Sequence, residues 1–206
     1  MALVRSVNGA LRRVPVGLVY AIGGVPVAWL MWALMKNGLG VDPAKTLEHQ
    51  LGGLGLQFLL ASLAVTPLRR ITGLSLLRFR RALGLLAFFY VALHLMTWLL
   101  LDLQLRWGEI GADVTKRPYI ILGMIGFVLL APLAATSHDW ALRRMGALAW
   151  HRLHRLVYVA GLAVVGHYVV QAKTLSLEVL AYSGCLIALL LARVAWALAK
   201  PPAPRP

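Results

Sequence analysis

Six long apolar runs, separated by short polar and mostly basic segments, make up almost the whole chain. The runs cover residues 14–35, 51–68, 82–101, 118–136, 153–172 and 177–199. A bilayer core is about 30 Å thick and a helix rises about 1.5 Å per residue, so roughly 20 apolar residues span it. The fifth run is the weakest, because it reaches this length only by including His154 and Arg155. The pattern predicts six transmembrane helices.

The predicted bundle leaves no room for a separate soluble domain. Residues 1–13 form a short N-terminal segment, residues 14–199 form the transmembrane domain, and the Pro-rich residues 200–206 form a disordered tail. The first run is too long for a signal-peptide core and lacks a clear cleavage site, so we expect it to be retained. No convincing internal repeat is evident. The sequence therefore predicts an all-α integral membrane protein built as one six-helix bundle.

The composition agrees with a membrane protein and excludes several other classes. Hydrophobic residues make up 60% of the chain and charged residues 14%, whereas soluble domains carry about a quarter charged residues. The formal net charge of +14 would suggest nucleic acid in a soluble protein. Here the basic residues cluster between apolar runs, so membrane topology explains them and no nucleic-acid partner is expected. The single cysteine, Cys185, excludes an internal disulfide and a c-type haem attachment motif.

The charged residues are divided unequally between the two sides of the predicted bundle. With helices that alternate in direction, one side holds 15 of the Lys and Arg residues and one acid, Asp139. The other side holds six basic residues and six acids. The positive-inside rule makes the more basic side cytoplasmic, so we expect both termini in the cytoplasm.

Two histidines lie deep within predicted spans, where ionisable residues are costly and usually functional. His94 follows Arg81 by 13 residues and His167 follows Arg155 by 12, which places the rings about 20 Å and about 18 Å from the cytoplasmic face. Because these depths nearly match, the two imidazoles are candidate axial ligands of one mid-membrane haem. The alternative for each is a structural histidine bonded to a neighbouring helix. No Asp or Glu lies at this depth, which argues against a proton relay or a cation carrier.

His154 lies near the cytoplasmic end of the fifth span, 13 residues before His167. An ideal helix rotates by about 220° over that distance, so the two rings share a face only if the helix bends. His154 is therefore an interfacial histidine, a ligand of a second haem on the cytoplasmic side, or a contact to a flavin. The other histidines lie at helix edges or at the interface and are predicted not to be ligands: His49, His138 and His151.

Basic and small residues in the spans carry further expectations. Arg80 and Arg81 begin the third span and are first of all topology determinants. They are also candidates to bind haem propionates or a flavin phosphate, because guanidinium binds carboxylate and phosphate with two N–H groups. Arg193 lies about two turns inside the last span and is expected to extend to the cytoplasmic surface. The glycines of the segment 52–55 are expected to allow close approach of a neighbouring helix.

Several sequence blocks resemble one known family. They are Asp42-Pro-Ala-Lys-Thr-Leu-Glu-His49, Val65-Thr-Pro-Leu-Arg69, Arg80-Arg-Ala-Leu-Gly-Leu with Leu93-His94-Leu95, Asp113-Val-Thr-Lys-Arg-Pro-Tyr119, and Leu153-His-Arg-Leu-Val-Tyr158 with His167-Tyr168. The Thr-Lys-Arg-Pro-Tyr and Leu-His-Arg-Leu-Val-Tyr blocks are specific at this spacing. The chain resembles the MsrQ (YedZ) family, the haem-binding membrane subunits of bacterial periplasmic methionine-sulfoxide reductase systems. That family belongs to the ferric-reductase-like transmembrane group, with the NADPH oxidases and metalloreductases.

The resemblance implies a b-type haem protein of the bacterial inner membrane, an electron-transfer subunit rather than the catalytic one. The implied partner is a periplasmic, molybdopterin-containing subunit that reduces methionine sulfoxide in oxidised envelope proteins. The implied electron donor is a cytoplasmic flavin reductase or bound FMN, or else quinol. The functional histidines of the family match His94, His154 and His167. One haem between His94 and His167 is predicted, and a second haem or FMN near His154 is a hypothesis.

Two other interpretations stay open. A haemless membrane scaffold or transporter would use the histidines structurally, and it would be colourless when purified. A stand-alone quinone-linked or metal-reducing cytochrome would be active without a periplasmic partner. For the implied two-component system, the outer loops 36–50 and 102–117, with Lys116 and Arg117, are the predicted docking surface.

Overall fold

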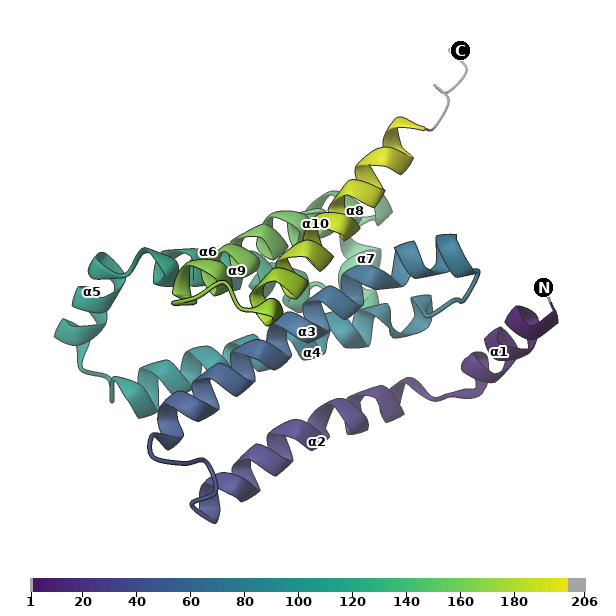
Figure 1. Cartoon of the computed structure of the whole chain (residues 1–206). Coiled ribbons are helices and arrows are strands. Elements are labelled where there is room, and N and C mark those ends of the chain that lie inside the picture. Colours follow the sequence, from purple (N-terminus) through teal and green to yellow (C-terminus); the bar gives the residue numbers. More distant parts are fainter. Residues whose placement is uncertain (1, 200–206) are drawn as a thin grey trace.

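The computed structural model describes residues 2–199, and the regular structure of this part is helical (Figure 1). The α-helices are α1 (Ala2–Arg13), α2 (Val16–Met35), α3 (Pro43–Thr72), α4 (Arg80–Thr97), α5 (Trp107–Lys116), α6 (Pro118–Ala135), α7 (Asp139–Met145), α8 (Ala147–His154), α9 (Leu156–Gln171) and α10 (Leu177–Leu198). A 3-10 turn, Leu77–Phe79, precedes α4, and a π-helical turn, Trp98–Asp102, follows it. The predicted tail 200–206 lies outside the described residues.

Six helical segments of the described chain are long and apolar enough to cross a membrane, which confirms the predicted architecture. They are α2, α3, α6, α10, the stretch Leu77–Asp102 around α4, and the stretch Ala147–Gln171 formed by α8 and α9. The fifth span begins at Ala147 rather than at the predicted residue 153. The reason is that the segment with His151 and Arg152 is itself helical, and the helix is interrupted only at Arg155.

Two close helix pairs form the centre of the bundle. α3 packs along α4, and α6 packs along α9. α10 lies against α9 and α3, whereas α2 lies at the side of the bundle against α4. Figure 1 shows that α1 and the end of α10 lie at the same end of the molecule. The two ends of the described chain therefore share one side, and the assignment of that side to the cytoplasm stays a prediction.

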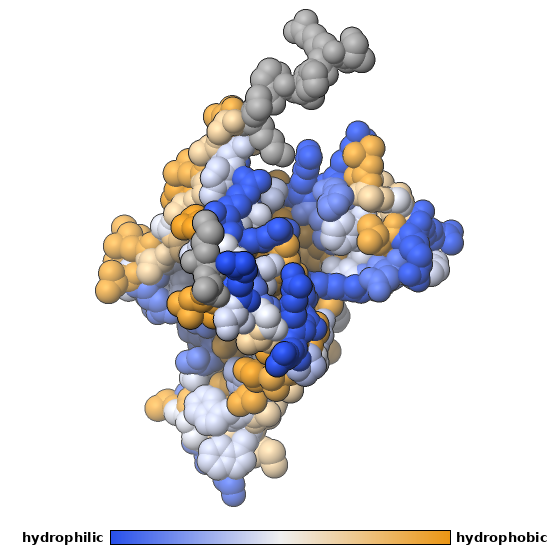
Figure 2. Space-filling view, turned by 90° about the vertical axis from the view of Figure 1, so that its right-hand side faces the viewer, coloured by the Kyte–Doolittle hydropathy of each residue, from blue (hydrophilic) through white to orange (hydrophobic). Residues whose placement is uncertain are grey.

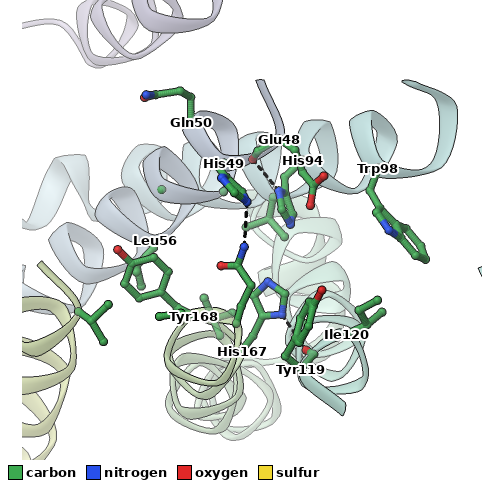
Figure 3. A pocket seen from close by; sticks show the side chains of 18 of the residues that line it. Glu48, His49, Gln50, Leu56, His94, Trp98, Tyr119, Ile120, His167 and Tyr168 are labelled. Carbon is green, nitrogen blue, oxygen red and sulfur yellow. Dashed lines mark hydrogen bonds between the residues drawn. The ribbon is translucent and has the colours of Figure 1, made fainter. Parts of the chain in front are cut away.

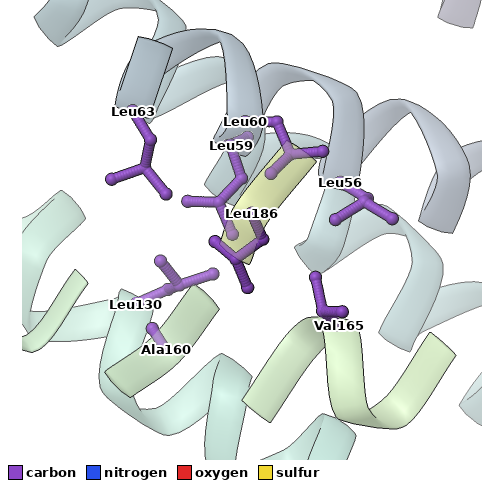
Figure 4. Close-up of a cluster of buried hydrophobic side chains, with 9 residues drawn as sticks. Leu56, Leu59, Leu60, Leu63, Leu130, Ala160, Val165 and Leu186 are labelled. Carbon is purple, nitrogen blue, oxygen red and sulfur yellow. The ribbon is translucent and has the colours of Figure 1, made fainter. Parts of the chain in front are cut away.

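The hydrophobic core lies where the two helix pairs meet α10 (Figure 4). Ala87 of α4 and Ala160 of α9 are fully buried in it, and residues this small let helices approach closely. Figure 4 shows Leu186 of α10 between the leucines of α3 and Ala160 of α9. The cluster consists of Leu56, Leu59, Leu60, Leu63, Ala87, Leu130, Ala160, Val165 and Leu186. This packing fixes the two helix pairs relative to each other.

Tyr90 of α4 fastens α2 to the bundle next to Pro26, the proline inside α2. Pro26 lies inside α2 and lacks an N–H group, which disturbs the local ladder of hydrogen bonds. The Tyr90 hydroxyl donates to the carbonyl of Gly23 at 2.6 Å and accepts from the N–H of Val27 at 3.2 Å. Gly23 also provides space, because a Cβ atom there would lie 2.4 Å from the Leu86 side chain. The fully buried Tyr90 thus replaces a helical hydrogen bond with a link between helices.

Arg193 points into the bundle, so the expectation that it extends to the membrane surface is wrong. Pro67 lies inside α3 and has no N–H group to bond the carbonyl of Leu63, four residues earlier. The guanidinium of Arg193 donates to this carbonyl and, at 2.7 Å, to the carbonyl of Leu189. It also lies 5.4 Å from the ring centroid of Tyr158. An unsatisfied carbonyl is costly in a bilayer, which explains the inward orientation.

Hydrophilic side chains gather at one end of the bundle, which we call the basic end (Figure 2). This end carries α1, the turn between α3 and α4, and α7. The side chain of Asn8 ties α1 to that turn by bonding the carbonyl of Gly73 and the N–H of Ser75. Arg81 ties the start of α4 to the start of α7 through an ion pair with Asp139 at 2.7 Å. These contacts hold the helices and turns of the basic end together.

Candidate functional site

His94 and His167 lie on different helices and point into the same space (Figure 3). His94 is in the last turn of α4, and His167 is in the last two turns of α9. Their ring centroids are 6.0 Å apart, and the ring planes are inclined by 74°. The structure thus brings together the two histidines that the sequence places at matching depth.

Each ring is held by a hydrogen bond between its Nδ1 atom and a backbone carbonyl of the neighbouring helix. Nδ1 of His94 lies 2.8 Å from the carbonyl oxygen of Glu48 in α3, and Nδ1 of His167 lies 2.7 Å from that of Tyr119 in α6. A carbonyl oxygen only accepts, so each Nδ1 carries a proton and donates. Nε2 then keeps the free lone pair of each neutral ring. Bonds of this kind typically orient metal-binding histidines.

The distance between the two rings fits one metal ion held between them. A metal-bound ring nitrogen lies about 2 Å from the metal and the ring centre about 1 Å further, so two imidazoles on opposite sides of one ion have centres about 6 Å apart. The observed distance between the centroids is 6.0 Å. Histidine is a common axial ligand of haem iron, so the pair has the spacing of a bis-histidine haem site.

A cavity of about 590 Å³ contains both rings, which is within the range of about 300–1,000 Å³ for cofactor sites. Its inner wall is apolar and includes Leu56, Val91, Phe127 and Val164. Its mouth carries three cationic side chains, Lys45, Arg117 and Lys173, and two carboxylates, Glu48 and Glu178, so the expectation that no acid lies at the level of the histidine pair is wrong for Glu48. An apolar wall with an excess of cations at the mouth suits a flat, mostly apolar group that bears carboxylates. The residues present therefore fit a haem.

The cavity opens at the end of the bundle opposite to the basic end, and we call this opening the mouth. Its lining includes the starts of α3 and α6 and the loop before α10. The histidine pair consequently lies closer to this end than the predicted mid-membrane level. The reason is that the span of His94 begins at Leu77 and that of His167 begins at Ala147, so both rings lie past the middle of their spans.

His154 lies outside this cavity. It is the last residue of α8, where the chain breaks before α9, and its ring stacks on Trp150 with the centroids 3.6 Å apart. Its Nδ1 atom lies 3.0 Å from the carbonyl oxygen of Trp150. Its Nε2 atom is buried and has no hydrogen-bond partner among the described residues. The ring therefore keeps one free nitrogen at a place separate from the His94–His167 pair.

The two candidate arginines, Arg80 and Arg81, also lie away from the cavity. Arg81 bonds Asp139 and the carbonyl of Ser137, so its guanidinium serves the contact between α4 and α7. Arg80 is half-buried and close enough to His154 to act on it electrostatically. The structure thus places Arg80, but not Arg81, beside a candidate site residue, and a cofactor contact of either stays a prediction.

His49 and Gln171 at the mouth are cavity residues that the sequence interpretation did not select. His49 lines the cavity and lies at the start of α3, next to Glu48 (Figure 3). The side-chain amide of Gln171 lies 2.9 Å from Nε2 of His49 and joins α9 to α3. Gln171 follows His167 by one helical turn, and this spacing is the signal that could have indicated its position.

Acidic and basic side chains join α3 to the end of α4 beside the mouth. The Nζ atom of Lys45 lies 3.2 Å from a carboxylate oxygen of Asp102 and 3.5 Å from one of Glu48. No residue pattern indicates this pairing, because it depends on the π-helical turn that carries Asp102. The result is a fixed rim on the side of the cavity formed by α3 and α4.

Comparisons with known proteins show which family the chain resembles. The family model described as ferric reductase like transmembrane component matches residues 50–165, more than half of the chain. The chain is 45% identical over 184 residues to the protein-methionine-sulfoxide reductase heme-binding subunit MsrQ of Brucella anthropi, covering 89% of this chain and 81% of that protein. The proteins of the same name from Brucella ovis and Brucella canis are each 44% identical with the same coverage. No solved structure was found to match the chain.

Proposed function

The chain belongs to the MsrQ family of ferric-reductase-like membrane proteins, and from this premise we propose that it is the haem-binding membrane subunit of a methionine-sulfoxide reductase system. In this proposal it carries electrons across the membrane to a periplasmic, molybdopterin-containing subunit. That partner reduces the sulfoxide, and the chain itself performs no substrate chemistry.

The observation that carries the proposal is the pair of imidazoles 6.0 Å apart, His94 and His167. A b-type haem bound between them would supply a one-electron iron centre. The carbonyls that accept from the two Nδ1–H groups fix the ring tautomers and make Nε2 a better ligand. His94 and His167 would both hold the iron, and ligation by two histidines would favour electron transfer over reaction with oxygen.

The cationic side chains at the mouth also support a bound group that carries carboxylates. Lys173 would pair with its carboxylates, whereas Lys45 and Arg117 already form ion pairs with Asp102 and Asp113 and would add positive charge nearby. The apolar wall would exclude water from the ring. A partner that docks at the mouth, on the outer segments 36–50 and 102–117 with the start of α3 and helix α5, would receive the electron there.

The proposal places the basic end in the cytoplasm and the chain in the bacterial inner membrane. The distribution of Lys and Arg supports this orientation. Electrons enter at the basic end from a flavin reductase or bound FMN, or from quinol within the bilayer. The mouth then opens toward the periplasm.

A second cofactor near His154, either haem or FMN, is the finer part of the proposal. Its support is the buried and unpartnered Nε2 atom of His154, with Arg80 close by. A cofactor at this place would shorten the path from the cytoplasm to the His94–His167 pair. One haem and no flavin per purified chain would contradict this part.

Optical spectra of the purified protein, with haem supplied during expression, test the main proposal. Wild type should show sharp reduced bands of low-spin b-type haem after dithionite, and His94→Ala and His167→Ala should each lose them. His151→Ala is the matched control, because that histidine is exposed and outside the cavity. A folded, colourless wild-type protein would return the scaffold or transporter interpretation. Activity without any periplasmic partner would favour a stand-alone cytochrome.

A further inference from the structure

The two helix pairs that hold His94 and His167 are built on the same local pattern. A Leu-Gly-x-x-Gly segment occurs at residues 51–55 in α3 and again at residues 122–126 in α6. A Val-x-x-His segment occurs at residues 91–94 in α4 and again at residues 164–167 in α9. The expectation of no internal repeat is therefore wrong at this level, because the duplicated positions are too few and too far apart to be seen without the fold.

In each helix pair, the first glycine lies directly against the imidazole ring. A Cβ atom at Gly52 would lie 3.0 Å from Nδ1 of His94, and one at Gly123 would lie 2.9 Å from Nδ1 of His167. At such distances the ring would have to move. The neighbouring Gly53 has nothing within 4 Å of the corresponding position, so the tight contact is specific to the repeated glycines.

The second glycine of each pair packs against a valine of the partner helix, one turn before the histidine. A Cβ atom at Gly55 would lie 2.8 Å from the side chain of Val91, and one at Gly126 would lie 2.7 Å from the side chain of Val164. These contacts set how closely each pair of helices approaches. Only the first glycine of each pair contacts the imidazole. Substitutions at the two glycines can therefore distinguish an effect on the position of the ring from an effect on helix packing.

The carbonyl that holds each ring lies four residues before the first glycine. Glu48 precedes Gly52, and Tyr119 precedes Gly123, by one helical hydrogen bond. In an α-helix the carbonyl of residue i already accepts from the N–H of residue i+4, so the ring must use the second lone pair of the oxygen. To reach this second lone pair, Nδ1 must lie over the α-carbon of residue i+4, where only glycine leaves room.

We propose that Gly52 and Gly123 are positioning residues for the two axial histidines. Each glycine, together with the carbonyl four residues earlier, forms a contact site for one imidazole, which we call a seat. The seat fixes the tautomer of the imidazole, the orientation of its plane and how far its Nε2 atom extends into the cavity. The inference rests on the proposed function for the identity of the ligand, but the seats are features of the chain itself. Because each ring is held at Nδ1, rotation about its bond to Cβ would break the hydrogen bond. The seats thus keep the ring planes inclined by 74°.

The test compares alanine variants of the two glycines of each seat in the full-length protein. Gly52→Ala and Gly123→Ala should weaken haem affinity by about 10- to 100-fold, as loss of an orienting contact typically does. The haem that remains should lose part of its low-spin bis-histidine spectrum.

Gly55→Ala and Gly126→Ala are the controls for a purely structural role. Because Val91 and Val164 line the cavity, these variants should lower both the melting temperature and the amount of haem bound, yet His94 and His167 should keep their Nδ1–H tautomers in the haem-free protein. Gly184→Ala, which has open space around the new methyl group, should behave as wild type. Wild-type affinity and spectrum in both Gly52→Ala and Gly123→Ala would overturn the inference.

A measurement without haem separates this inference from the proposed function. In the haem-free protein labelled with 15N-histidine, nitrogen chemical shifts should show Nδ1–H tautomers for His94 and His167 in wild type and a change of tautomer in the two seat variants. If wild type shows these tautomers but binds no haem, the proposed function fails and the seats stand. If wild type binds haem but the two rings carry the proton on Nε2, the seats fail and the proposed function stands.

Discussion

At the scale of single residues, the role of each histidine follows from which ring nitrogen stays free. His94 and His167 donate through Nδ1 to carbonyls and keep Nε2 for a ligand in the cavity. His138 instead accepts the N–H of Ala141 through Nδ1 and caps the start of α7. His49 is paired with Gln171 at the mouth. The same side chain therefore serves as a candidate ligand, a helix cap or a link between helices.

Replacing Gln171 with alanine should have only a small effect, because its bond to His49 is solvent-exposed. We expect the free energy of unfolding to fall by no more than about 1 kcal/mol. Haem content and the axial spectrum should stay as in wild type. Thermal unfolding and haem quantification check this, and a loss of haem would show that the His49–Gln171 pair belongs to the ligand site.

The sequence was sufficient to select His94 and His167, since depth along a helix is a matter of counting residues. It could not indicate the carbonyls of Glu48 and Tyr119, because backbone groups leave no signature in the residue type. It also could not place His154 relative to the pair. The break at Arg155 decides that, and it depends on tertiary packing rather than on local propensity.

At the scale of elements, prolines inside α2 and α3 are compensated by side chains from other helices. Tyr90 bridges the disturbed ladder near Pro26, and Arg193 satisfies the carbonyl that Pro67 leaves without a partner. Such compensation is required in a bilayer, where water cannot supply the missing hydrogen bonds. The prolines and their partners therefore act as specific links between helices.

Arg193→Leu should lower the free energy of unfolding by about 1–3 kcal/mol, because it leaves the Leu63 carbonyl unsatisfied. Pro67→Ala restores an N–H group for this carbonyl, so Arg193→Leu should cost less in the Pro67→Ala background. A double-mutant cycle on thermal or denaturant unfolding in detergent measures this coupling. Strictly additive effects would show that Arg193 does not act through the Pro67 break.

Tyr90→Phe removes one hydroxyl and should cost about 1–3 kcal/mol, since a buried carbonyl and a buried N–H of α2 both lose their partner. The packing of the ring against Phe58, 5.4 Å between centroids, should be retained. Phe89→Leu on the more exposed side of α4 is the control and should cost less. A Tyr90→Phe variant as stable as wild type would mean that α2 closes its own ladder.

The six spans could be predicted because hydrophobic length decides whether a helix crosses a bilayer. Helix α5 was not predicted, since Trp107–Lys116 is short, polar and placed in a loop by its charges. The fifth span begins earlier than predicted for a related reason, because the basic residues of α8 are typical of a loop. Polar helices at membrane ends carry little hydrophobic signal, so only the structure defines them.

At the scale of the whole molecule, the arginine-rich turns and the cavity lie at opposite ends of the bundle. Hydrophilic side chains gather at the basic end (Figure 2), and the cavity that opens at the other end holds the histidine pair shown in Figure 3. In the proposed function, the basic end would meet the electron donor, and the mouth, near the His94–His167 pair, would meet the acceptor.

Electron transfer across sealed vesicles tests the central claim most directly. The haem-loaded protein is reconstituted into liposomes that contain ferricyanide, dithionite is added outside, and an ionophore carries compensating charge. The entrapped ferricyanide should be bleached many times faster than in protein-free vesicles, and His94→Ala should abolish the difference. Bleaching by the haem-loaded wild type at the protein-free rate would contradict the account.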